Sequence, residues 1–186
     1  MITVKKEKVK EIKRLLDEIL ESENKTYKQG DALTYKHLEW YVIKDNESTI
    51  DLLPTKVLSE ELIKNYVTDE FMRDGFKVRM TDTIRPISWK DSFIYKELLP
   101  KIKEDFKAEN VTLLSKEEIE VLPLEIKACG EWYWTSTPIE NGCHVECATG
   151  FAGVSGNGYS FIGWYASGAY GVRPLVSINK DLLEGE

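Results

Sequence analysis

The sequence predicts an α+β fold, because helical patterns and a hairpin fill its first two thirds and glycine-rich, aromatic stretches fill the last third. Apolar residues recur at helical spacing over residues 3–22, which is typical of an amphipathic helix. Residues 130–171 instead interleave glycines with aromatic residues and contain no lysine or arginine. That stretch is too rich in glycine for helices and too aromatic for a linker, so it predicts short strands joined by long surface loops.

Residues 1–24 are predicted to form an N-terminal helical extension to a single domain that spans residues 28–181. Cations precede anions along this helix and oppose its dipole, so packing must hold it in place. We expect it to dock on its own domain. The alternatives are a homodimer contact through residues 3–22 and a membrane-surface or nucleic-acid role. Its apolar positions are Val9, Ile12, Leu15, Leu16, Ile19 and Leu20.

The middle of the chain carries separate signals for strands, turns and capped helices. Two apolar runs around the turn 45–47 predict a hairpin, and Ser59, Ser88 and Ser115 precede helical stretches as N-cap residues do. Residues 71–86 are expected to be irregular. In chain order, the predicted elements are strands 34–44 and 48–57, a helix 59–67, a helix 89–98 that ends or kinks at Pro100, a strand 111–114, and a helix that begins at Ser115 and ends at Pro123.

Composition excludes several function classes. The 186 residues carry a net charge of −7, so neither nucleic acid nor an anionic membrane is expected as a partner. No run of about 18 apolar residues and no signal-peptide pattern occurs, which favours a cytoplasmic location. The three cysteines form an odd set and are expected to be reduced thiols. With only His37 and His144 as histidines, neither a metal site nor a cofactor is expected.

Two motifs of the last third resemble the end of C-type-lectin-like domains. They are Gly130–Thr137, with Trp132 and Trp134, and Tyr170–Ile178, with the run Gly-Val-Arg-Pro. The pattern is similar to the formylglycine-generating-enzyme-like branch, and most similar to an uncharacterised domain family of Firmicutes and their phages. The segments 30–43 and 111–118 also fit, so the resemblance covers about residues 28–180.

The resemblance implies a C-type-lectin-like fold, with short antiparallel sheets, at least two helices and long C-terminal loops. In such folds the loops before the last strands display the ligand-binding face, here residues 137–145 and 148–170. The composition of this stretch supports the same role, because aromatic residues give contact area and Gly, Ser and Asn let loops adapt. Packing of the same aromatic residues inside the domain is the alternative. The predicted binding residues are Phe151, Asn157, Tyr159, Trp164, Tyr165 and Tyr170.

Three residues of the motifs are predicted to be structural. Trp132 and Trp134 are expected to pack in the core. Arg173 lies between Val172 and Pro174, where its guanidinium could bind loop carbonyls or a carboxylate through its fixed fork of donors. These residues would frame a binding surface and would not form it.

Cys143 and Cys147 are the main argument for an enzyme. In a regular strand they would share a face about 13 Å apart, too far for a disulfide. The formylglycine-generating branch oxidises a substrate cysteine with copper and a cysteine pair, but its spacing is one residue longer and its active-site surroundings are missing here. The calcium-binding lectin signatures are absent too. No catalytic residue is therefore assigned, and free structural cysteines are the simpler interpretation.

The sequence thus predicts a non-enzymatic binding module for a protein or a glycan. The resemblance favours a phage or prophage protein, either virion-associated or acting on a host factor in the cytoplasm. The acidic charge and reduced cysteines favour the second setting. The alternatives are a cysteine-dependent formylglycine-generating-type oxidase and an assembly protein that dimerises through its N-terminal helix.

Overall fold

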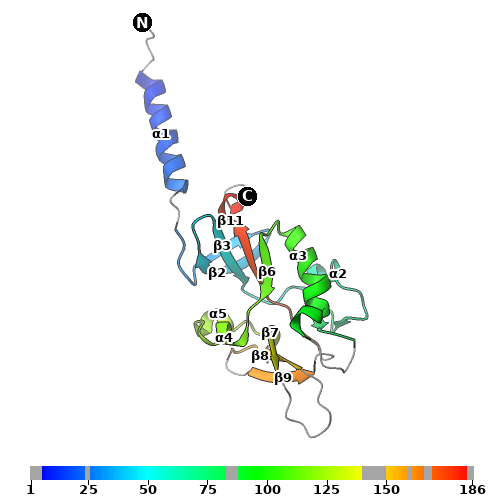
Figure 1. The fold of residues 1–186 in the computed structure, drawn as a ribbon. Coiled ribbons are helices and arrows are strands. Elements are labelled where there is room, and N and C mark those ends of the chain that lie inside the picture. Colours follow the sequence, from blue (N-terminus) through cyan, green and yellow to red (C-terminus); the bar gives the residue numbers. More distant parts are fainter. Residues whose placement is uncertain are drawn as a thin grey trace.

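The computed structural model describes residues 6–23, 26–82, 88–139, 150–158, 161–165 and 169–183. Over these residues the fold is α+β, as the sequence predicts, with short helices and three small antiparallel sheets (Figure 1). The amphipathic helix α1 (Lys6–Glu23) precedes the first sheet.

The largest sheet has five strands in the order β1-β2-β3-β11-β6. The last strand of the chain lies between β3 and β6, where Val176 is opposite both Leu52 and Val111. The predicted hairpin is therefore joined edge to edge with the C-terminal strand. The bounds are β1 (Ala32–Tyr35), β2 (Leu38–Asp45), β3 (Thr49–Pro54), β6 (Asn110–Leu113) and β11 (Pro174–Asn179), which the turn η3 (Lys180–Leu183) follows.

One face of this sheet packs on a larger hydrophobic cluster. Trp40 and Val42 of β2 are fully buried there, because alternate residues of a strand point to one side. The cluster also takes Ile63 from helix α2 (Glu60–Lys64) and Ile102 from helix α3 (Leu99–Asp105). The Ser59 hydroxyl accepts from the Leu62 amide at 3.4 Å, which confirms the predicted cap of α2.

A second hydrophobic cluster lies around Leu53 and Tyr133 and is closed by two short helices, α4 (Lys116–Glu120) and α5 (Leu124–Lys127). The predicted capping box of α4 is confirmed. The Ser115 hydroxyl accepts from the Glu118 amide at 3.1 Å, and the Glu118 carboxylate accepts from the Ser115 amide at 2.7 Å.

Two three-stranded sheets complete the domain. One has the order β7-β8-β9 and contains most of the described residues of the glycine-rich stretch. The other, β10-β5-β4, joins that stretch to the region predicted as irregular. The bounds are β4 (Met72–Arg73), β5 (Lys77–Arg79), β7 (Tyr133–Ile139), β8 (Gly150–Val154), β9 (Phe161–Tyr165) and β10 (Ala169–Tyr170).

Helix α1 does not dock on the domain, so that expectation is wrong. It extends away from the rest of the chain (Figure 1), and Val9, Ile12, Leu15 and Leu16 are 45–55% exposed. The charges that oppose its own dipole are therefore not offset by packing on the domain. None of the described helices is both long enough and apolar enough to cross a membrane.

Two further predictions are corrected by local backbone geometry. The predicted strand 34–44 is broken at Lys36 and His37, whose φ angles of 48° and 62° form a tight two-residue turn between β1 and β2. The predicted helix 89–98 consists of a 3₁₀ turn, η1 (Trp89–Asp91), and a π turn, η2 (Ile94–Leu98). Pro100 does not end the helix but lies in the first turn of α3, where its missing N–H costs little.

The capping box predicted at Ser88 is also wrong. The Ser88 side chain makes no hydrogen bond to the helical backbone, and its hydroxyl donates to the Asp91 carboxylate at 2.7 Å. The same sequence pattern is therefore a cap at Ser115 and a side-chain pair at Ser88, because a 3₁₀ turn follows Ser88.

Candidate functional site

The two ends of the glycine-rich, aromatic segment meet at one point. The Gly171 amide donates to the Trp132 carbonyl at 2.9 Å, and the Trp134 amide donates to the Gly171 carbonyl at 3.1 Å. Tyr133 and Gly171 thereby form an isolated parallel bridge. The two ends of residues 135–170, here called the displayed segment, therefore lie side by side at a closed base.

Buried aromatic packing holds this base. Trp134 is 1% exposed, and its indole N–H donates to the Val78 carbonyl at 2.6 Å. The ring of Tyr170 lies 4.7 Å from that of Trp134 and 5.5 Å from that of Trp132. A Cβ on Gly153 would lie 2.2 Å from the Tyr170 ring, so only glycine fits beneath it. Tyr170, predicted as a binding residue, is half-buried in the base, and burial raises its pKa.

Arg173 fastens the same base to the rest of the domain. Its guanidinium is buried and donates to the carbonyls of Pro54 and Ile126, both at 2.7 Å, and of Lys127 at 3.3 Å. It also lies 5.3 Å from the centre of the Tyr133 ring. These are the carbonyl contacts that a structural arginine makes through its fork of donors. They join β3 and α5 to the residue that precedes β11.

The other predicted binding residues are described in different detail, from a side-chain contact to the strand register alone. Asn157 is exposed in the turn after β8, where its side-chain carbonyl accepts from the Ser155 hydroxyl at 2.6 Å. Phe151 pairs with Trp164 in the register of β8 and β9, and Tyr165 pairs with Gly150. Tyr159 lies outside the described residues, as do His144 and the pair Cys143 and Cys147.

The turn that carries Asn157 is held against the chain after α5. The amides of Cys129 and Gly130 both donate to the Gly156 carbonyl, at 3.0 and 2.8 Å. A Cβ on Gly156 would lie 2.4 Å from the Gly130 carbonyl oxygen, so this close approach requires glycine. The displayed segment therefore also contacts the domain away from its base.

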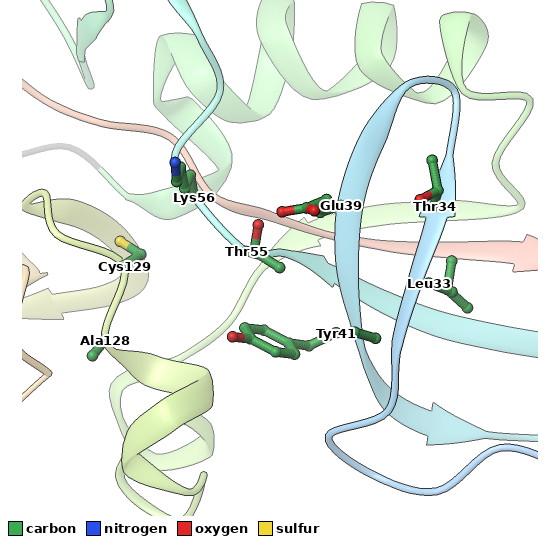
Figure 2. A pocket seen from close by; sticks show the side chains of 9 residues that line it. Leu33, Thr34, Glu39, Tyr41, Thr55, Lys56, Ala128 and Cys129 are labelled. Carbon is green, nitrogen blue, oxygen red and sulfur yellow. The ribbon is translucent and has the colours of Figure 1, made fainter.

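Next to this contact lies a hollow of about 500 Å³ between the large sheet and the end of α5 (Figure 2). The phenol of Tyr41 extends from β2 toward Ala128, and the hydroxyl and charged groups of the lining come from β1, β2 and the chain after β3. A phenol ring, hydroxyls and charges of both signs suit a small polar ligand. The lining residues are Ala32, Leu33, Thr34, Glu39, Tyr41, Thr55, Lys56, Ala128 and Cys129.

The sequence does not predict this hollow. Glu39 and Tyr41 alternate with the buried Trp40 and Val42, which indicates that β2 has a second, more polar face. Nothing in the sequence indicates that Ala128 and Cys129, far along the chain, lie opposite that face.

The chemistry of the hollow does not favour a nucleophile. The Cys129 thiol is half-buried and donates to the Glu131 carbonyl at 3.3 Å. Burial raises its pKa, although the Arg173 charge acts in the opposite direction. The thiolate is the reactive form of cysteine, so a raised pKa makes Cys129 a poor nucleophile at neutral pH. Across the described residues, no three His, Cys, Asp or Glu side chains are placed to hold a metal ion.

Comparison of the chain with protein-family models, with curated proteins and with solved structures found no match.

Proposed function

We propose that this chain is a binding module that recognises a protein or a glycan through the displayed segment 135–170. The observation that carries the proposal is the closed base formed by Trp132, Trp134 and Gly171. Recognition loops are effective when a rigid scaffold fixes their ends, because less conformational freedom is lost on binding. The buried Arg173 network supplies that scaffold here.

We also propose that the arrangement is C-type-lectin-like. The support is topological. The C-terminal strand β11 pairs with β3 of the β2–β3 hairpin, and a separate small sheet, β7-β8-β9, lies in the part of the chain that precedes β11. This is the placement of a ligand-displaying segment that the sequence resemblance implies. The cellular setting remains an expectation of that resemblance and of the acidic charge: a cytoplasmic or virion-associated phage protein, with a host factor as the partner in the first case.

The contact with residues 129–130 extends the proposed surface toward the hollow. The turn at Gly156 abuts Cys129, a wall of the hollow, and it presents the exposed Asn157. A ligand that contacts this turn can therefore also reach the polar groups around Tyr41. Such a shared surface suits a ligand with many hydroxyl or amide groups, as in a glycan or a polar peptide.

The experiment has two stages. An array of glycans and crosslinking to host proteins first identify what the intact chain binds. The dissociation constant of that ligand is then measured for three surface variants, Trp164→Ala, Asn157→Ala and Tyr41→Ala, and for the control Tyr95→Ala. Tyr95 is an exposed tyrosine of η2, remote from both regions in sequence.

We expect Trp164→Ala to weaken binding by about tenfold or more, because aromatic anchors carry much of the energy of binding surfaces. Asn157→Ala and Tyr41→Ala should weaken it less, and Tyr95→Ala should leave it unchanged. Each variant must keep the unfolding midpoint of the parent chain for its result to count as loss of contact. Equal affinity in all four folded variants would show that the ligand binds elsewhere and would contradict the proposal.

A further inference from the structure

Helix α1 has an exposed apolar face that the domain does not cover. Val9, Ile12, Leu15 and Leu16 are each 45–55% exposed, in a helix of 18 residues. In proteins most of the stability of a helix comes from packing its apolar face on a partner and not from the helix propensity of its residues. An uncovered face of this kind is expected to bury itself against a partner.

The sequence of α1 separates charge along its length. Residues 6–14 contain five cations and two anions, whereas residues 15–23 contain four anions and no cation. A parallel pair of these helices would place like charges side by side, and an antiparallel pair places the basic half of each helix beside the acidic half of the other. The charge pattern therefore matches a second copy of the same helix in the antiparallel orientation.

The same pattern resolves the conflict with the helix dipole. Within one helix, cations near the N-terminus and anions near the C-terminus are unfavourable. In an antiparallel pair, the C-terminal end of the second helix, with its partial negative charge, lies beside the basic half of the first. Charges that destabilise α1 alone thus become favourable in the pair.

The apolar spacing supplies a register for this pairing. Val9, Ile12, Leu16 and Ile19 follow one another at intervals of three, four and three residues, which is the spacing of a coiled-coil seam. If two helices cross antiparallel about residue 14, Val9 of each lies opposite Ile19 of the other. Ile12 of each then lies opposite Leu16.

From the exposed face and the charge pattern together, we propose that α1 is a dimerisation helix that pairs antiparallel with α1 of a second copy of this chain. The inference does not depend on the proposed binding function. Because α1 leaves the domain at the end opposite the β7-β8-β9 sheet (Figure 1), the dimer would carry two displayed segments facing outward. Where ligands are clustered, two linked sites bind with greater avidity than one.

Sedimentation of the full chain over a series of concentrations tests the dimer. We expect a reversible shift from the 21.4 kDa chain to twice that mass. Ile12→Asn and Leu16→Asn should each raise the dimer dissociation constant by roughly tenfold or more, because each places a polar group in the seam. The control Val121→Asn alters an apolar residue that is 82% exposed outside α1, and it should leave the constant unchanged. A monomer at every concentration, or a dimer equally sensitive to all three changes, would overturn the proposal.

Cysteine crosslinking tests the orientation. A chain with both Val9→Cys and Ile19→Cys should form disulfides between position 9 of one copy and position 19 of the other, identified by mass spectrometry of the peptides. The single variant Val9→Cys should give no 9-to-9 linkage above the level of background crosslinks, because those positions lie about 15 Å apart along the antiparallel pair. The unmodified chain controls for crosslinks through its three native cysteines. Efficient 9-to-9 linkage would indicate a parallel pair and contradict the proposal.

Charge reversal gives an independent test of the same geometry. Lys10→Glu with Lys13→Glu changes the net charge of residues 6–14 from +3 to −1, and Asp17→Lys with Glu21→Lys changes that of residues 15–23 from −4 to 0. Each double variant alone should dimerise more weakly than the parent chain, with the largest difference at low salt. An equimolar mixture of the two should dimerise better than either variant alone, because the acidic half of the first then lies beside the basic half of the second. Unchanged association of either double variant at low salt would contradict charge pairing between copies.

Discussion

The two ends of the β3–β11 strand pair are fastened by different chemistry. Where β3 ends and β11 begins, the buried Arg173 donates to main-chain carbonyls. At the other end, the half-buried Asp45 carboxylate forms an ion pair with Lys180 and accepts from the Tyr27 amide at 2.7 Å. One end therefore uses hydrogen bonds that neither salt nor acid removes, and the other uses a pair that salt screens and acid neutralises.

The two ends of the strand pair also differ in the part of the chain that is attached to them. The buried end is the base of the displayed segment, where Trp134 and Gly171 bring the chain back to its starting point. The ionic end receives the chain that arrives from α1 through Tyr27. Rigid positioning is needed where loops are displayed, whereas the attachment of a helix that binds outside the domain does not require it.

Removal of Trp134 should have the largest effect on stability. Trp134→Ala leaves a cavity among fully buried residues and removes the hydrogen bond to the Val78 carbonyl. We expect a loss of about 3–5 kcal/mol in the free energy of unfolding, measured by urea titration. Trp89→Ala, at a half-buried tryptophan of η1, is the matched control and should cost clearly less. Equal losses in the two variants would contradict a special role for the base.

Arg173 should rank second. Arg173→Met keeps much of the side-chain volume but leaves the buried carbonyls of Pro54 and Ile126 without a donor, at a cost of about 2–4 kcal/mol. Arg173→Lys should recover little of this, because one ammonium group cannot reproduce a fork that spans three carbonyls. Urea unfolding of both variants measures the difference. Full recovery with lysine would show that charge, and not the fork, stabilises this end.

Tyr133 should contribute less and should make the buried end sensitive to alkali. Its hydroxyl donates to the Lys127 carbonyl at 2.8 Å, and burial raises its pKa to about 12. Since the folded pKa lies above the usual value of about 10, the stabilisation is complete below pH 10 and is lost as the pH rises toward the folded value. Tyr133→Phe should cost about 1 kcal/mol at neutral pH and should flatten the alkaline limb of the stability profile. An unchanged alkaline limb would contradict this assignment.

The sequence predicts the elements better than the surfaces that they build. The caps at Ser59 and Ser115, the hairpin and the apolar face of α1 follow from local patterns, so they could be found without a structure. The turn at Lys36 and His37 could not, because tight turns with positive φ usually carry glycine or asparagine. Its geometry is instead held by a distant contact, in which the Lys36 side chain donates to the Asp105 carbonyl.

The candidate site shows the same limit. The frame residues Trp134 and Arg173 stand out in the sequence because both belong to recognisable motifs. The hollow does not, because Tyr41 and Cys129 are brought together only by the packing of α5 on the sheet. Likewise, the pattern of α1 predicts which residues are apolar but not whether the domain covers them. Local signals are thus sufficient for elements, whereas a site assembled from distant segments needs the fold.

Removal of the Asp45 charge, at the ionic end, should have the smallest effect on stability. This effect should depend on pH in the opposite direction to the effect of removing the Tyr133 hydroxyl. Burial alone would raise the pKa of Asp45, but its hydrogen bonds to Lys180 and to the Tyr27 amide outweigh burial and lower it. A lowered folded pKa means that the stabilisation is present above the unfolded value of about 4 and is lost as the pH falls through the folded value.

Asp45→Asn should therefore cost about 1 kcal/mol or less at neutral pH. The difference from the parent chain should shrink below about pH 4 and also at high salt, where charges are screened. Urea titrations of both chains at several pH values measure it, with Asp69→Asn, at an exposed aspartate outside this strand pair, as the control that should change stability little. A cost that stays constant from neutral to acid pH would show that Asp45 acts through packing and not through its charge, and the contrast between the two ends of the sheet would then fail.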